Sequence, residues 1–218
     1  MILEAVTTKI FSMSPTERLA QLFSEFPGIG RRQARRFVYF LLSKDKVFIK
    51  NITNALLAVQ EEVLQCEQCY RFYAKDKSSS PHCPICMDEH TDHSLMLVIE
   101  KDVDFENIKK ADVHAGRYFI LGGSIPILEQ DPSKKIRARE LVAEVSRATK
   151  EDGLKEVIIA LSANIEGENT TQYVKKILEP LSEKSGLIVS TLGRGLSTGT
   201  ELEYSDSTTL EHALKNRS

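Results

Sequence analysis

Four cysteines in two closely spaced pairs constrain this chain more than any other feature of its sequence. Cys66-Glu67-Gln68-Cys69 is followed by thirteen residues and then by Cys83-Pro84-Ile85-Cys86. Each Cys-x-x-Cys turn directs two sulfurs to one point, and two such turns complete a tetrahedron. The spacing predicts one structural Zn²⁺ ion per chain, held by Cys66, Cys69, Cys83 and Cys86, with no open position for water.

The alternative reading of these cysteines is two disulfides or idle thiols. The residues from Met1 to Lys9 do not resemble a signal peptide, and no apolar run reaches eighteen residues. We therefore expect a cytoplasmic protein without a membrane span, and a reducing compartment favours metal ligation over disulfides. The segment is too small and polar to fold alone, so metal binding would supply much of its folding free energy. His82, His90 and His93 are expected to lie near the site without ligating the ion.

The segment before the cysteines, residues 1 to about 62, is predicted to be helical. Ser14-Pro15 is typical of a helix start, and a second helix is expected after Gly30. A third is expected over roughly residues 52–63. Between the first two lies Phe26-Pro27-Gly28-Ile29-Gly30, a turn whose glycines allow close approach of another molecule.

The turn is followed by basic residues at the start of the second helix. Free N–H groups at a helix start bind phosphate well, and arginines add positive charge there. The combination resembles the helix-hairpin-helix motif, which holds the DNA backbone without reading bases. The predicted DNA-binding residues are Gly28, Ile29, Gly30, Arg31, Arg32 and Arg35. The plainer alternative is a helical hairpin with solvated arginines, and the net charge of −2 means that any DNA contact must be local.

From residue 94 onward, short apolar segments alternate with helical ones, which predicts an α/β domain with a mainly parallel sheet. Strands are expected over residues 95–99, 118–121, 157–161 and 187–191, and helices over 134–150 and about 168–184. A glycine-rich tail then ends in a short helix near residues 208–215. No small-molecule substrate site is evident, and no internal repeat is found.

The α/β region resembles the Toprim domain of topoisomerases and bacterial primases. In that family a strand-end Glu and a downstream Asp-x-Asp hold Mg²⁺, and Glu-Gly-Glu commonly follows. Here Glu100 ends a strand and Glu166-Gly167-Glu168 is present, but Ser162-Ala163-Asn164 replaces the acidic pair. A hydroxyl and an amide are poor Mg²⁺ ligands, so we expect a Toprim fold that has lost its chemistry. The dipole of a helix start alone would also account for Glu166 and Glu168.

The order of helix-hairpin-helix, four-cysteine zinc finger and degenerate Toprim domain resembles the RecR family of recombination mediators. Two further segments support the resemblance: Gly116-Arg117-Tyr118-Phe119, and the tail from Arg194 to Tyr204 with Ser207-Thr208-Thr209-Leu210. Departures occur at residues 125–132, at 162–164, and at Ser197 and Thr200.

The resemblance implies four parts: residues 1–64, 65–92, 93–192, and a strand-helix tail at 193–218 that contacts a neighbouring subunit. It also implies a non-catalytic, ring-shaped homotetramer in DNA repair that acts with RecO, and in some settings RecF, at gapped or single-stranded DNA to help load RecA. Two other readings remain open: an active Toprim enzyme, and a zinc-ribbon interaction module without a role on DNA.

Overall fold

The computed structural model describes residues 13–75, 80–193, 195–196, 199, 201–205 and 207–215. The chain divides into two compact units, residues 1–63 and 64–218. Ser78 and Ser79 of the cysteine segment lie outside the described residues, as do Arg194, Ser197, Thr198 and Thr200 of the tail. Among the described residues, no helix combines the length and the apolar character needed to cross a membrane.

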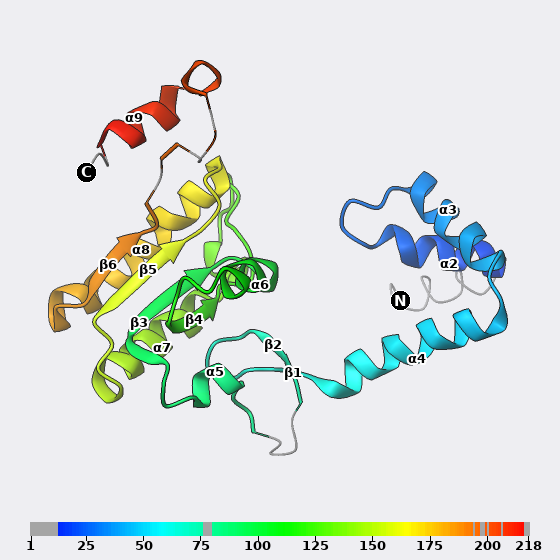
Figure 1. The fold of residues 1–218 in the computed structure, drawn as a ribbon, viewed down its shortest axis with the longest axis horizontal. Helices are drawn as coiled ribbons and strands as arrows, with labels where there is room; N and C mark the ends of the chain where they lie inside the picture. Colours follow the sequence, from blue (N-terminus) through cyan, green and yellow to red (C-terminus); the bar gives the residue numbers. More distant parts are fainter. Residues whose placement is uncertain are drawn as a thin grey trace. The chain divides into compact units, whose positions relative to one another are not determined.

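The first unit contains the predicted helices. Its described helices are α2 (Pro15–Ser24), α3 (Arg31–Leu42) and α4 (Lys46–Glu62) (Figure 1). Ser14 caps α2 and forms a reciprocal capping box with Glu17, as the Ser-Pro start predicts. The prediction for α4 was wrong by six residues at its start, because the Asp45 side chain accepts the Phe48 amide at 2.8 Å and starts the helix early.

Helices α2 and α3 pack against each other as an antiparallel pair around a small aromatic contact. The Phe23 and Phe37 rings meet edge to face with their centroids 5.7 Å apart. Ala34 and Val38 of α3 are buried. This packing fixes the turn between the two helices and leaves the polar side of α3 in solvent.

The second unit begins with the cysteine segment and continues into a four-stranded sheet (Figure 1). The cysteine segment contains β1 (Val63–Gln65), β2 (Phe72–Ala74) and α5 (Pro84–Met87). The sheet has the strand order β4-β3-β5-β6, and all of its pairings are parallel. Its strands are β3 (Asp92–Ile99), β4 (Gly116–Ile120), β5 (Glu156–Ala160) and β6 (Ile188–Thr191). The predicted mainly parallel α/β sheet is confirmed.

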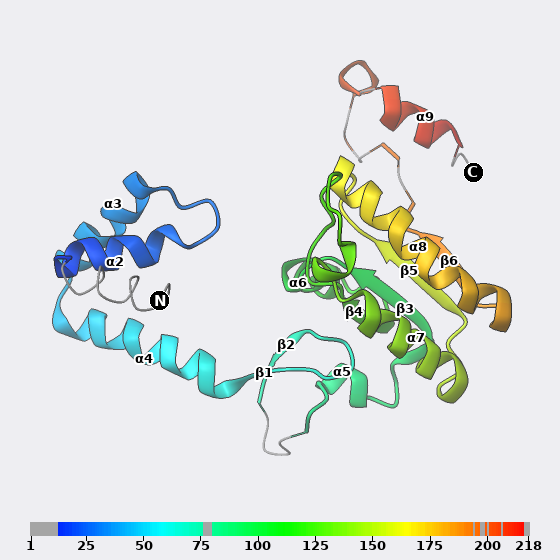
Figure 2. The ribbon, with the colours of Figure 1, turned by 180° about the vertical axis from the view of Figure 1, so that it is seen from behind.

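Helices cover both faces of this sheet. Alternate residues of β3 point to opposite sides, so Met96 and Val98 join one core cluster and Leu97 and Ile99 join another. The first cluster is covered by α7 (Ala138–Glu151) and α8 (Ile165–Ser185), which lie in front of the strands in Figure 2. The second is covered by α6 (Asp102–Ala111), a helix that the sequence reading did not predict, through Phe105.

The connection between β4 and α7 contains residues 125–132, one of the segments in which the sequence departs from the pattern of the family that it resembles. It contains a short 3₁₀ helix, η1 (Pro132–Lys134). Ile125 is buried, its amide donates to Thr170 Oγ1 at 2.8 Å, and Asn169 Nδ2 donates to the Ile125 carbonyl at 3.0 Å. The loop is therefore fastened to α8 by side-chain hydrogen bonds. The tail adds η2 (Leu202–Tyr204) and the short helix α9 (Ser207–Lys215), close to its predicted bounds.

Candidate metal centre and nucleic-acid interface

The four predicted metal ligands come together in one cluster. Their sulfur atoms all lie within 4.8 Å of one another, and three of the four residues are buried. The Cys69 and Cys83 sulfurs are 3.6 Å apart, and those of Cys66 and Cys86 are 3.9 Å apart. A disulfide bond is about 2 Å long, so the alternative of two disulfides is not found. Sulfurs of a tetrahedral zinc site with bonds of about 2.3 Å lie about 3.8 Å apart.

The crowding of these sulfurs favours a bound cation. Hydrogen bonds from Cys69, Cys83 and Cys86 lower the pKa of the Cys66 thiol. Hydrogen bonds to Cys66 raise the pKa values of Cys69 and Cys86, because a second negative charge would lie against the first. A divalent ion removes this conflict, since all of its sulfur ligands are deprotonated. The donor set fits a closed, structural site, because among the described residues the cluster contains four thiols and no other ligand group.

Backbone bonds hold each cysteine turn in place. The Cys66 carbonyl accepts the Tyr70 amide at 3.0 Å, and Tyr70 takes a positive φ of 61° to close the turn. The Cys83 amide donates to the Cys66 sulfur at 3.3 Å, which links the two turns directly. The histidines His82, His90 and His93 are not part of the sulfur cluster.

The cysteine segment is fastened to the edge of the sheet. The Ile120 amide of β4 donates to the Cys69 carbonyl at 2.8 Å, and the Tyr70 ring packs on Phe119 with centroids 5.4 Å apart. Gln68 Nε2 donates to Glu144 Oε1 of α7 at 3.0 Å. Sequence reasoning missed this role of Gln68, because nothing in the Cys-x-x-Cys spacing indicates which helix lies beside it.

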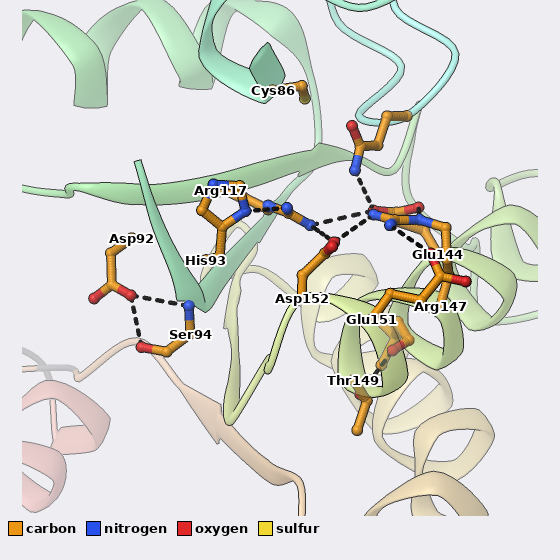
Figure 3. A network of polar contacts seen from close by, with 12 residues as sticks. Cys86, Asp92, His93, Ser94, Arg117, Glu144, Arg147, Thr149, Glu151 and Asp152 are labelled. Carbon is orange, nitrogen blue, oxygen red and sulfur yellow. Dashed lines mark hydrogen bonds and ion pairs between the residues drawn. The ribbon is translucent and has the colours of Figure 1, made fainter. Parts of the chain in front are cut away.

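Glu144 belongs to a buried ion-pair network around Arg117, shown in Figure 3. Arg117 is 3% exposed; it donates to Asp152 at 2.5 Å and also contacts the His93 ring. Arg147 contacts both Glu144 and Asp152, at 2.7 and 2.8 Å. Burial opposes the charge on Asp152, but the hydrogen bonds from Arg117 and Arg147 outweigh it and lower the pKa of this carboxyl. The network joins β3, β4, α7 and the cysteine segment.

The residues of the predicted Toprim remnant lie at the carboxyl edge of the sheet. Strands β3 and β5 are neighbours, with Ile99 opposite Ala160, so Glu100 and Ser162 follow them side by side. Ser162 Oγ donates to Glu100 Oε2 at 3.1 Å, and Lys101 Nζ lies 2.7 Å from Glu100 Oε1. The Glu100 carboxylate, whose side chain is 8% exposed, thus already has a hydroxyl and an ammonium as partners.

The other remnant residues build the start of α8. The Asn164 side chain caps the helix by accepting the Gly167 amide at 2.8 Å. A Cβ on Gly167 would lie 1.9 Å from the Ser162 carbonyl oxygen, so only glycine fits between Glu166 and Glu168. Glu166 accepts a hydrogen bond from Ser124 at 3.3 Å, and Glu168 lies in the same first turn. Sequence reasoning missed Lys101, although its position next to Glu100 was a usable signal.

The predicted phosphate-binding turn lies between α2 and α3. Gly28 has a φ of +76°, which favours glycine, and the Ile29 amide donates to the Phe26 carbonyl at 3.0 Å. Added Cβ atoms on Gly28 or Gly30 would meet no atom within 4 Å, so the outer side of the turn is open. Gly30 caps α3 without a side-chain hydrogen bond, and exposed Arg31, Arg32 and Arg35 follow it. The geometry can accept a phosphate group.

Comparison with known proteins adds two matches to family models and a set of whole-length relatives. Residues 94–192 match the Toprim domain, and residues 195–218 match the C-terminal region of RecR. Proteins named Recombination protein RecR from Chlorobium phaeobacteroides and Chloroherpeton thalassium are each 34% identical to this chain over 208 residues, covering 95% of it and 98% of their own length. One from Bacteroides thetaiotaomicron is 34% identical over 201 residues, 92% of each chain.

Proposed function

The chain belongs to the RecR family of recombination proteins, and on that premise we propose that it is a non-catalytic, DNA-binding mediator of recombinational repair. One observation carries this proposal. An open Gly-Ile-Gly turn leads into a helix start whose amides lack a side-chain cap and which carries three exposed arginines. Such a helix start binds phosphates and reads no bases, which suits a protein that must act at any sequence.

The charge distribution supports DNA contact through the first unit. Residues 1–63 carry nine Lys and Arg against six Asp and Glu, whereas residues 64–218 carry 20 against 25. A strongly negative strand is therefore attracted to the helical unit and repelled by the sheet unit. We propose Gly28, Ile29, Gly30, Arg31, Arg32 and Arg35 as the DNA-binding residues.

The other modules are proposed to have structural and assembly roles. Cys66, Cys69, Cys83 and Cys86 hold one Zn²⁺ that folds the segment at residues 65–92 and joins the helical module (1–64) to the Toprim domain (93–192). Glu100, Ser162, Asn164, Glu166 and Glu168 form a Toprim edge without catalysis. The proposed absence of catalysis rests on the Ser and Asn that replace two acids, and on Lys101 beside Glu100.

We extend the proposal to assembly and partners on the strength of the family. The chain forms a tetrameric ring, in which the tail at residues 193–218 contacts a neighbouring subunit. In the cytoplasm it works with RecO, and in some settings RecF, to help RecA replace single-strand-binding protein. Exposed apolar side chains on the second half of α4, Leu56, Leu57 and Val59, support a subunit contact in the helical module. Weak phosphate contacts from four subunits would add through effective concentration.

A triple substitution tests the DNA-binding role. Arg31→Glu, Arg32→Glu and Arg35→Glu should abolish binding of a labelled single strand in fluorescence anisotropy, because repulsion replaces phosphate attraction. The variant should keep the helical circular dichroism of the wild type, since all three side chains are exposed. Undiminished binding would remove the turn from the proposed function.

Light scattering with and without gapped DNA and RecO tests the proposed tetrameric ring and the proposed partner.

A further inference from the structure

A second cationic surface lies on the helical unit, at the other end of α3 from the Gly-Ile-Gly turn. It is an open groove of about 440 Å³. Its lining residues are Lys44, Lys46, Ile49, Lys50, Thr53 and Asn54. Three of these six side chains are ammonium groups, and none of the three has an ion-pair partner in the part of the chain that the structure describes.

Local structure explains how the lysines come together. Lys46 and Lys50 are four residues apart on α4, so they lie on one face of that helix together with Thr53 and Asn54. Lys44 precedes α4, and its ammonium lies over the Phe40 ring, 4.5 Å from the centroid. Phe40 in turn packs edge to face on Phe48 of α4. The aromatic pair thus holds the Lys44 charge at the groove.

The acid nearest in sequence is already engaged. Asp45 lies between Lys44 and Lys46, but its carboxylate accepts the Phe48 amide at 2.8 Å and caps α4. The hydroxyl of Thr53 donates to the Ile49 carbonyl at 3.0 Å, which leaves the lysines and the Asn54 amide as the polar groups open to a ligand. The groove therefore offers hydrogen-bond donors and positive charge, which suits an anionic ligand with several oxygen acceptors.

The position of the groove relates it to the turn. Arg32, Arg36 and Phe40 are spaced four residues apart on α3 and form one row, which Lys44 continues over the Phe40 ring. The twelve residues of α3 span about 18 Å, the length of about five phosphates along one strand of B-DNA. One nucleic-acid strand can therefore reach from the turn to the groove within the same helical unit.

We propose that this groove is a second binding site for the phosphate backbone of DNA, and that Lys44, Lys46 and Lys50 are its contacts. The inference rests on the proposed function and extends it from one phosphate-binding point to a path along α3. It assigns the lysines a role in affinity and salt dependence, and none in sequence preference.

The test compares paired substitutions in the full-length protein. Lys46→Gln with Lys50→Gln should lower the slope of log affinity against log salt by about 0.7 for each lost contact with a single strand. The wild type's advantage over this variant should shrink about sevenfold between 50 and 200 mM salt. Lys109→Gln with Lys110→Gln is the matched control, because it removes the same charge from exposed positions on α6. Equal slopes in the groove and control variants would overturn the inference.

Two further arms keep the outcomes apart. Asn54→Lys adds a cation to the groove and should raise both affinity and slope, so a folding defect in the first variant cannot hide the result. Arg31→Gln with Arg32→Gln reports on the turn: if this variant loses binding while the groove variant does not, the groove fails and the proposed function stands. If the wild type does not bind DNA at all, the proposed function fails first. Thermal stabilisation by ATP that the groove variant loses, without any effect on DNA affinity, would assign the groove to free nucleotides and overturn the backbone assignment.

Discussion

Two places in the second unit contain residues of the kinds that bind metal ions in proteins. They differ in what surrounds those residues. The cysteine cluster brings four soft ligands within 4.8 Å of one another around a shared centre. The carboxyl edge of the sheet has kept Glu100 but surrounds it with Ser162 and Lys101, at 3.1 and 2.7 Å. Four crowded sulfurs form a cluster that could hold a cation at the first place, whereas at the second the Lys101 ammonium already lies beside the acid.

The contrast lies in the ligands, since one place offers four thiols and the other a single carboxylate beside a hydroxyl and an ammonium. A closed site of four thiols contributes folding free energy and no reactivity. A site for Mg²⁺ chemistry needs several anionic oxygens with room for water, and here the acids are replaced or occupied. We therefore expect this sheet edge to keep the Toprim fold without Mg²⁺ chemistry, because residues at the strand ends can change while the sheet stays the same.

Removing the metal should produce the largest effect in the molecule. The purified protein should contain about one zinc per chain, the number that four ligands hold. Cys83→Ser or a strong chelator should unfold the cysteine segment, since structural zinc in such small modules contributes about 10–16 kcal/mol. Trypsin should then cut after Arg71 and Lys75, while residues 94–192 keep the circular dichroism of a folded α/β domain. Metal-free protein with an unchanged digestion pattern would contradict a structural role of the metal in the cysteine segment.

The next largest effect should come from the buried ion pairs that join the cysteine segment to the sheet. Arg117→Met leaves the acids Asp152 and Glu144 without their most buried partner, and we expect a loss of about 3–5 kcal/mol in the free energy of unfolding by urea. Zinc content should not change, because the hydrogen bonds of Arg117 go to Asp152 and His93, which are not among the four proposed zinc ligands. Arg147→Met is the matched control: this arginine is 34% exposed, so its loss should cost about 1 kcal/mol. Equal losses of unfolding free energy in the two variants would mean that burial of the arginine does not determine how much its ion pairs contribute to stability.

The sequence predicted the cysteine cluster well and the surroundings of the cluster and of the sheet edge poorly. The Cys-x-x-Cys spacing is local, so it identified the four clustered cysteines without knowledge of the fold. Glu100, at a strand end, was also predictable from an apolar run. The hydrogen bond from Gln68 to Glu144, 76 residues away, depends on which helix covers the sheet, and no local pattern encodes it. The early start of α4 was missed because Asp45 was not recognised as a cap.

A double substitution tests whether the loss of acids is what separates the two sites. Ser162→Asp with Asn164→Asp restores the acidic pair, and the first new carboxylate would replace the hydroxyl that now donates to Glu100. Without Mg²⁺, repulsion between the new carboxylates and Glu100 should lower the free energy of unfolding by about 1–2 kcal/mol. This magnitude is close to that expected for like charges exposed to solvent. Added Mg²⁺ should recover this loss in the variant and leave the melting temperature of the wild type unchanged. If Mg²⁺ stabilised the wild type but did not stabilise a neutral Ser162→Asn control variant, the sheet edge of the wild type would bind a metal ion.

Glu100→Gln should have the smallest effect, and it is the most direct test of an edge without catalysis. The amide oxygen of Gln can still accept the hydrogen bond from Ser162. The ion pair that is lost joins Glu100 to Lys101, whose side chain is 64% exposed. The free energy of unfolding should therefore fall by less than about 1 kcal/mol. DNA affinity should change by no more than about twofold, or about 0.4 kcal/mol, because the proposed DNA contacts lie in the helical unit. The decisive measurement is nicking of supercoiled DNA with Mg²⁺, for which wild type and variant should both equal the protein-free control. If the wild type nicked DNA and the variant did not, Glu100 would be required for strand cleavage. The sheet edge would then be a catalytic metal site, and its contrast with the structural cysteine site would not hold.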